Sequence, residues 1–325
     1  MVSNQPSKPS RGERVSVCLL AYNHAAALAD TVRSVLAQTL PSFEFIISDD
    51  CSTDGTWEIA TDLARNYPNI RAIQTPRNLG MCGNANFAVS HAAGDYIALL
   101  HHDDDYRQDL LERWLEVIER YNNVAFVFNE CACPREDGVW LGHKDQGRIF
   151  PELIPGQSFL ENDLLGRWGC YVWGTAMIRR SCWEAVGGMR TEFGMLADVD
   201  LWMRLAARWD VGYVADPLIT LCRKRPDYYP AEYRTFSWGR TKLLYSIHAS
   251  NLAQHYAKAG LRYWWKWLQF RTRVSLETCK WLTYALIRKR IEIIRESAGG
   301  ECAWEFFPVR WYRNCLMWGH RMGVI

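Results

Sequence analysis

Several features that define other protein classes are missing from this chain of 325 residues. No run of 18 apolar residues occurs, so we expect no transmembrane helix. Residues 1–13 contain Pro, Ser and Lys but no apolar core, so we expect a flexible leader and no secretory signal. The first apolar run is not followed by G-x-G-x-x-G, and no G-x-x-x-x-G-K-[ST] occurs. Dinucleotide-binding and P-loop classes therefore lose their main sequence support.

Cysteine is present eleven times, but a pairing motif is absent. Cys131 and Cys133 form the one close pair, their spacing is unlike a zinc site, and no second pair answers them. Scattered thiols suit a reducing compartment, so we expect a cytoplasmic protein without a disulfide framework. The formal net charge of +2 by itself indicates no particular partner.

Charge is distributed unevenly along the chain. Residues 257–325 contain 13 Lys and Arg against 5 Asp and Glu, and seven tryptophans, whereas the preceding residues have an acidic excess. Basic and aromatic residues interleaved on helices suit a membrane surface, here the inner face of the cell membrane. The alternatives are a helical subdomain that packs on the core and a surface that forms a homo-oligomer. No nucleic-acid-binding motif accompanies the pattern, so we expect no nucleic-acid partner.

Apolar runs and amphipathic segments alternate between residues 15 and 128. The pattern predicts strands at 15–21, 43–48, 70–74, 96–100 and 124–128, and helices at 25–38, 57–67, 83–92 and 109–121. Such alternation is typical of βαβ units on a mainly parallel sheet, which makes the fold class α/β. After residue 129 the alternation breaks, and we expect loops, strands at 172–178 and 211–221, and helices from about 246. The predicted domains are 14–230 and a C-terminal helical region, 231–325.

Polar clusters follow three of the predicted strands, namely Tyr22-Asn23-His24, Asp49-Asp50 and His101-His102-Asp103-Asp104-Asp105. Because the carboxyl ends of parallel strands lie at one edge of a sheet, we expect the clusters to converge there. Adjacent carboxylates repel one another unless water or a cation compensates them, and a hard divalent cation suits them best. For the third cluster, the alternative is a solvated acidic loop that caps the next helix.

A second acidic stretch opens the helix predicted at 198–205. Asp198 and Asp200 fall in its first turn, where Asp often caps a helix or stabilises its dipole. Either carboxylate could instead be a general base that takes a proton from an acceptor hydroxyl. Further along, Arg223-Lys224-Arg225 could meet phosphate oxygens or could face solvent.

Five segments, taken in order, carry a family resemblance: Val15–Asn23, Ser48–Thr56, Arg77–Gly80, Gly94–Leu100 and Asp198–Leu205. Together they resemble the family 2 inverting glycosyltransferases over about residues 14–225. The resemblance implies a GT-A fold, a nucleotide-diphosphate sugar donor and a divalent metal, Mn²⁺ or Mg²⁺. It also implies single displacement with inversion at the anomeric carbon and a glycan or lipid-linked glycan as acceptor.

The resemblance assigns roles residue by residue. It implies that Asp103 and His101 hold the metal, and that Asp198 is the general base with Asp200 as its competitor. The residues expected at the nucleotide sugar are Tyr22, Asn23, Asp49, Asp50, Asn78, His102 and Arg225. Two positions depart from the family, because His101 stands where Asp is common and Ala197 stands where a carboxylate commonly precedes the base. These departures favour one rival, a catalytically weak sugar-nucleotide-binding or scaffold protein. A nucleotidyltransferase would need a Gly-rich basic loop after the first strand, which is absent.

Overall fold

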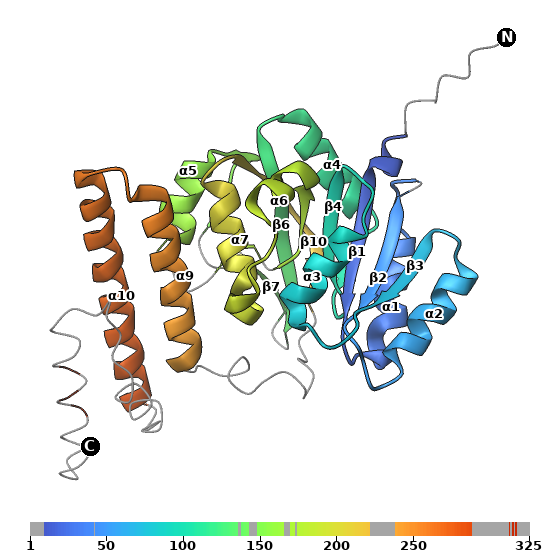
Figure 1. Ribbon diagram of the computed structural model, residues 1–325, viewed down its shortest axis with the longest axis horizontal. Coiled ribbons are helices and arrows are strands. Elements are labelled where there is room, and N and C mark those ends of the chain that lie inside the picture. Colours follow the sequence, from blue (N-terminus) through green and yellow to red (C-terminus); the bar gives the residue numbers. More distant parts are fainter. Residues whose placement is uncertain are drawn as a thin grey trace. The chain divides into compact units, whose positions relative to one another are not determined.

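A computed structural model describes residues 10–41, 43–135, 138–142, 148–165, 170–172, 174–221 and 238–287, with Tyr312, Asn314 and Leu316 (Figure 1). The chain divides into two compact units. The sheet unit comprises Met1–Leu160 and Tyr171–Tyr228, and the tail unit comprises Glu161–Cys170 and Tyr229–Ile325. The sequence did not predict that residues 161–170 belong with the tail.

One sheet forms the centre of the sheet unit, with strand order β3-β2-β1-β4-β9-β6-β10-β5. In addition, β7 pairs with β6 and β8 with β10. The strands are β1 Val15–Ala21, β2 Glu44–Asp49, β3 Ile70–Gln74, β4 Tyr96–His101, β5 Asp105–Tyr106, β6 Val124–Arg135, β7 Gly138–Leu141, β8 Leu153–Ile154, β9 Ala176–Arg179 and β10 Asp210–Thr220. The long strands β3, β2, β1, β4, β6 and β10 run in one direction, and the short β9 runs against its two neighbours. The predicted α/β class with a mainly parallel sheet is confirmed.

The sheet unit contains seven described α-helices, and the tail unit contains two. They are α1 Ala25–Leu36, α2 Thr56–Asn66, α3 Gly80–Ser90, α4 Leu110–Arg120, α5 Gly156–Phe159, α6 Arg180–Val186, α7 Ala197–Ala206, α9 Trp238–Tyr256 and α10 Leu261–Ile287. Short 3₁₀ turns span Gly12–Arg14 and Thr191–Leu196, and a π-helical turn spans Leu160–Leu164. Within the described part of the chain, no helix is both long and apolar enough to cross a membrane.

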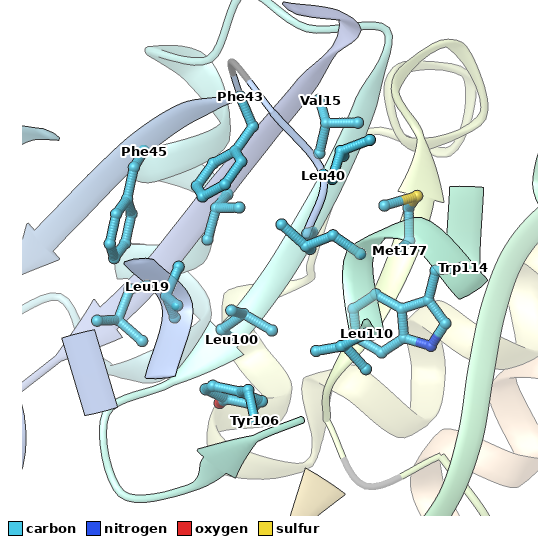
Figure 2. Close-up of a cluster of buried hydrophobic side chains, with 14 of the residues drawn as sticks. Val15, Leu19, Leu40, Phe43, Phe45, Leu100, Tyr106, Leu110, Trp114 and Met177 are labelled. Carbon is cyan, nitrogen blue, oxygen red and sulfur yellow. The ribbon is translucent and has the colours of Figure 1, made fainter. Parts of the chain in front are cut away.

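Alternate residues of the central strands build the main core. Val15 and Leu19 of β1 point to the same side as Leu100 of β4, and this side packs against Leu110 and Trp114 of α4 (Figure 2). The period of two in the strands and the apolar face of α4 therefore meet in one cluster. On the other side of the sheet, Phe126 of β6 packs against Trp202 of α7, with ring centroids 4.8 Å apart. Both faces are covered, which explains why the central strands are apolar throughout.

The structure corrects several predicted boundaries. The strand expected from residue 172 begins only at Ala176, because Gly174 before it has φ +82° and cannot extend the strand. The strand expected to end at 128 continues to Arg135, where it forms a hairpin with β7. The helical tail begins at Trp238 rather than near residue 246.

Candidate active site

The loops after β1 and β2 are joined by backbone and side-chain hydrogen bonds. Asn23 has φ +46°, in the left-handed region that Asn tolerates better than most residues. Its N–H donates to Ser52 Oγ at 2.9 Å, and its Oδ1 accepts from the Thr53 N–H at 2.8 Å. The N–H of His24 donates to Thr56 Oγ1 at 2.9 Å. The two loops predicted to converge at the sheet edge do so.

Asp49 lies at the end of β2 and is completely buried. Its carboxylate accepts from the Ser52 N–H at 3.1 Å, from Gln74 Nε2 at 2.9 Å, and from the Ser52 hydroxyl. A buried carboxylate is stable only when donors of this kind satisfy it. Asp49 therefore holds the loop after β2 against the end of β3.

Asp50 ties the same loop to the start of α3. Its Oδ1 accepts from the Leu79 N–H at 2.8 Å and from Thr75 Oγ1 at 2.9 Å. Burial raises the pKa of Asp50, and these two donors act in the opposite direction. Asn78 is used locally, since its Oδ1 accepts from the Gly80 N–H at 2.9 Å where α3 begins. Three loops are thus fixed to one another before any ligand binds.

His101 ends β4, and its main chain is held by Tyr106. The His101 N–H donates to the Tyr106 hydroxyl at 2.8 Å, and that hydroxyl donates to the His101 carbonyl at 2.8 Å. Tyr106 is buried in the main core (Figure 2), which raises the pKa of its phenol well above the usual range. The clamp fixes the direction in which the His-Asp cluster leaves the sheet.

His102 connects the ends of β4 and β1. Its Nδ1 is 2.8 Å from the Leu20 carbonyl, which can only accept, so Nδ1 carries the proton. The ring packs edge-on against His24, with centroids 4.6 Å apart. Burial lowers the pKa of His102 to about 4, although the nearby Asp103 carboxylate favours the protonated form. His102 is therefore neutral at neutral pH and offers no positive charge to a phosphate.

The three carboxylates after His102 have different surroundings. Asp103 is half-buried, Asp104 is buried, and Asp105 is exposed at the start of β5. Thr31 of α1 donates to the backbone carbonyls of His102 and Asp104 at 2.9 and 3.1 Å, so this turn is attached to α1. Within the ranges that the structure describes, no three His, Cys, Asp or Glu side chains gather into a metal cage.

Gly174 is where the His-Asp cluster after β4 meets the start of α7. A Cβ built on Gly174 would lie 2.8 Å from His101 Nε2 and 3.7 Å from Asp198 Oδ2. Both side chains therefore border the same small space, which the glycine leaves open. Asp198 is oriented by its own helix, because its Oδ1 accepts from the Val199 N–H at 2.8 Å in the first turn of α7. Two residues that are far apart in the sequence are brought together.

Asp200 is engaged in a buried ion pair. It accepts from Arg204 Nε at 2.6 Å and lies 3.4 Å from Arg190 Nη1. Arg204 also donates to the carbonyls of Val186 and Gly188, both at 2.7 Å. Burial lowers the pKa of Arg204, and the charge of Asp200 opposes that shift. The pair holds α7 against the end of α6.

Two predicted residues, Tyr22 and Arg225, have no role in the contacts described above. Arg225 lies outside the described residues. Tyr22 is half-buried directly after β1, at the same edge as Asp50. Sequence reasoning missed Gly174, Thr75 and Tyr106. The signal for Gly174 was a glycine just before an apolar run, which indicates a close approach of backbone to a neighbouring group.

The polar loops and the carboxylate-rich turn lie beyond the carboxyl ends of the parallel strands, which is where α/β sheets bind their ligands. Residues 16–187 match the model of the family described as "Glycosyl transferase family 2". The chain belongs to this family and is a glycosyltransferase.

One relative matches this chain over more residues than the family model does, and another over fewer. The Bacillus subtilis protein "Putative glycosyltransferase EpsE" is 30% identical over 237 residues, which cover 72% of this chain and 81% of the relative. The hyaluronan synthase of Pasteurella multocida is 33% identical over 149 residues, which cover 46% of this chain but only 15% of that protein.

Solved structures share the fold. TarS 1–349 of S. aureus in complex with UDP-GlcNAc has a TM-score of 0.61 and 16% identity, over 81% of this chain and 72% of that one. The mannosyltransferase PcManGT of Pyrobaculum calidifontis, in complex with GDP-Man and Mn²⁺, has a TM-score of 0.54 and 16% identity, over 93% and 83%. The similarity to both establishes the architecture of this chain as the GT-A type.

Proposed function

We propose that this enzyme is an inverting glycosyltransferase that moves a sugar from a nucleotide-diphosphate donor to a hydroxyl of a glycan or lipid-linked glycan. One observation carries the proposal: His101 at the end of β4 and Asp198 in the first turn of α7 border the same space at Gly174. A base on one side of this space and a leaving group on the other fit a single in-line displacement.

The donor would bind at the loops after β1, β2 and β3. Tyr22 offers an aromatic surface on which the nucleobase of the donor could stack. Asp50 and Asn23 lie on the loops that are joined to one another by hydrogen bonds. Asp49 would have a structural role at this site, because its carboxylate oxygens already accept hydrogen bonds from Ser52 and Gln74. The sugar nucleotides bound by TarS and PcManGT support a donor of this class.

A divalent metal would be held by Asp103, with His101 as a second candidate ligand. The donor set fits Mn²⁺, which accepts both carboxylate oxygen and imidazole, better than Mg²⁺. When bound, such a metal stabilises the charge of the departing diphosphate. Mn²⁺ in the PcManGT complex supports this assignment.

The reaction needs one proton transfer and one displacement. Asp198 takes the proton of the acceptor hydroxyl as the oxygen attacks the anomeric carbon. The new C–O bond forms while the bond from that carbon to the diphosphate oxygen breaks, and the nucleotide diphosphate leaves with the electron pair. Asp198 is the better candidate for the base because Asp200 is neutralised by Arg204 and Arg190.

The named relatives bear on the acceptor, and the cysteines bear on the cellular location. Relatives named hyaluronan synthase and chondroitin synthase support a role in polysaccharide biosynthesis. Six of the described cysteines are free thiols, which supports a reducing cytoplasmic compartment; they are Cys18, Cys51, Cys82, Cys131, Cys133 and Cys182.

The experiment that tests the proposal is a panel of nucleotide sugars scored by thermal shift with Mn²⁺, followed by mass spectrometry of the products. The configuration of the new bond is then read by NMR. We expect one donor to stabilise the protein and to be turned over, with inverted configuration and a strong loss of turnover in Asp103→Asn. Retained configuration would contradict the proposed mechanism. Donor binding without any turnover, with or without acceptors, would instead support the scaffold protein.

A further inference from the structure

The first two turns of α10 expose four large apolar side chains. Leu261 is 88% exposed, Trp264 65%, Trp265 60% and Leu268 47%. Their spacing of three, one and three residues places them along one side of a helix. We call these four residues the α10 stripe. Among the described residues, the sheet unit exposes large apolar side chains only singly, at Tyr67 and Ile149.

The opposite side of α10 is occupied within the tail unit. Phe270 follows Leu261 by nine residues, about half a turn round from the stripe, and is buried, and Thr278 and Leu282 are buried further along the helix. The hydroxyls of Tyr245 in α9 and Thr278 in α10 are 2.9 Å apart, and the ring of His248 in α9 stacks on Phe270 at 6.2 Å. Contacts with α9 thus fix the rotation of α10, and this rotation turns the stripe outward.

The start of α10 is fixed by ion pairs to Glu161. Arg262 Nη2 lies 2.9 Å from Glu161 Oε1, Lys266 Nζ lies 2.5 Å from Oε2, and the Tyr256 hydroxyl lies 2.5 Å from Oε1. Arg262 and Lys266 alternate with the residues of the stripe. The stripe is therefore presented on an ordered helix end rather than on a fraying one.

Basic residues flank the stripe at both ends. Lys258 is exposed three residues before Leu261, and Arg271, three residues after Leu268, packs over the Trp267 ring at 5.3 Å. Tryptophan beside Lys and Arg matches the membrane–water interface, where the indole lies at headgroup depth and the cations meet lipid phosphates.

We propose that the α10 stripe is a docking surface for an anionic membrane, with α10 lying in the headgroup layer. Charge favours this occupant over a second copy of the chain. In a two-fold dimer formed through the stripe, the Lys and Arg side chains beside the stripe of one copy would lie near those of the other copy. The repulsion between these like charges opposes such a dimer. The stripe contains no residue of the proposed reaction, so the docking surface and the enzyme mechanism stand or fall separately.

The test is flotation of the full-length protein with phosphatidylcholine vesicles that contain or lack phosphatidylglycerol. The stripe variant is Trp264→Ser with Trp265→Ser. The matched control is Ile149→Ser, which removes a 79% exposed apolar side chain from the sheet unit. We expect the wild-type chain and the control to float with anionic vesicles, more weakly at high salt. The stripe variant should bind about tenfold more weakly or worse, with unchanged thermal stability and donor turnover.

Three results would overturn the proposal. The first is no flotation of the wild-type chain with anionic vesicles. The second is equal flotation of the stripe variant and the control. The third is a dimer in solution, measured by light scattering, that the stripe variant abolishes while vesicles bind neither protein. That third result would assign the stripe to a second copy of the chain.

Discussion

The sheet unit and the tail unit differ in which side chains they bury and which they expose. At the site edge of the sheet unit, Asp49, Asp50 and Asp200 are buried, and each is held by several donors. In the tail unit, large apolar side chains stand in solvent next to basic groups. The sheet unit thus orders polar groups inside the protein, whereas the tail leaves its apolar groups for a surface outside it.

This difference shows what each unit is suited to do. A carboxylate fixed by donors keeps its geometry when a ligand arrives, which is what a site for displacement chemistry needs. An exposed apolar stripe needs no such precision, because a lipid surface adapts to it. The comparison predicts that substitutions in the sheet unit affect catalysis or folding, and that exposed substitutions in the tail affect location.

Asp198→Asn should give the largest effect. The amide cannot accept the proton of the acceptor hydroxyl, so we expect kcat to fall by about 10²- to 10⁴-fold. Steady-state kinetics with the identified donor, combined with donor affinity by calorimetry, measures the change. Donor affinity and the free energy of unfolding should stay near their wild-type values. Near-normal turnover of Asp198→Asn, together with a folded but inactive Asp200→Asn, would move the base to Asp200.

Asp200→Asn should act on folding instead. It leaves the buried Arg204 without its main anionic partner, which costs about 3–5 kcal/mol. Urea unfolding followed by circular dichroism measures this loss, and Asp198→Asn is the matched control on the same helix turn. An unchanged unfolding midpoint for Asp200→Asn would contradict the assignment of a structural role to Asp200 and a catalytic role to Asp198.

Gly174→Ala should disturb the space between the two halves of the site. The added Cβ meets His101 Nε2 at 2.8 Å, and φ +82° is unfavourable for alanine. We expect a loss of kcat of about 10²-fold from misplaced side chains, with a cost in stability of about 1–2 kcal/mol. Gly187 has a similar φ of +75°, but a Cβ added there meets open space. Gly187→Ala therefore controls for the cost of placing alanine in a left-handed backbone conformation without the contact to His101. Equal activity losses in both variants would remove the special role of Gly174.

The tail unit should respond to mild acid through His248. Burial lowers the pKa of His248 to about 4 from its ordinary 6.5. Because this folded-state pKa is depressed, stability is complete above pH 6.5 and is lost as the pH falls toward 4. At pH 5 the loss is about 2 kcal/mol. Limited proteolysis at pH 7.5 and pH 5 should cut α9 and α10 sooner at the lower pH, and His248→Phe should reduce that difference. Equal cleavage rates at both pH values would contradict this.

Most of the first half of the sheet unit, from β1 to α4, could be predicted from the sequence. The strand expected at 70–74 matches β3 in full, and the helix expected at 109–121 differs from α4 by one residue at each end. Local patterns suffice there because each strand and helix in a βαβ unit carries its own hydrophobic period. The converging loops followed from parallel topology alone.

The second half of the sheet was harder, for a physical reason. The short strand β9 inserts between β4 and β6, although the residues that pair with it are at least fifty positions away in the chain. Nothing local in a run of four residues indicates a reversed direction or distant partners. The space at Gly174 depends on that insertion, so the meeting of His101 and Asp198 could be inferred only by resemblance. The buried pairing of Asp200 with Arg204 matches a helical spacing of four, but burial decides its strength and sequence does not give burial.

The reversed strand has a consequence for which parts of the chain build the space at Gly174. Ala176 pairs with Leu99, so Gly174 reaches the open end of β4 from outside the βαβ series. The loops after β1, β2 and β3 are joined to one another by the hydrogen bonds of Asn23, Asp50 and Thr75. The two sides of this space are therefore held by separate parts of the chain, and we expect a substitution beside Gly174 to leave those hydrogen bonds in place.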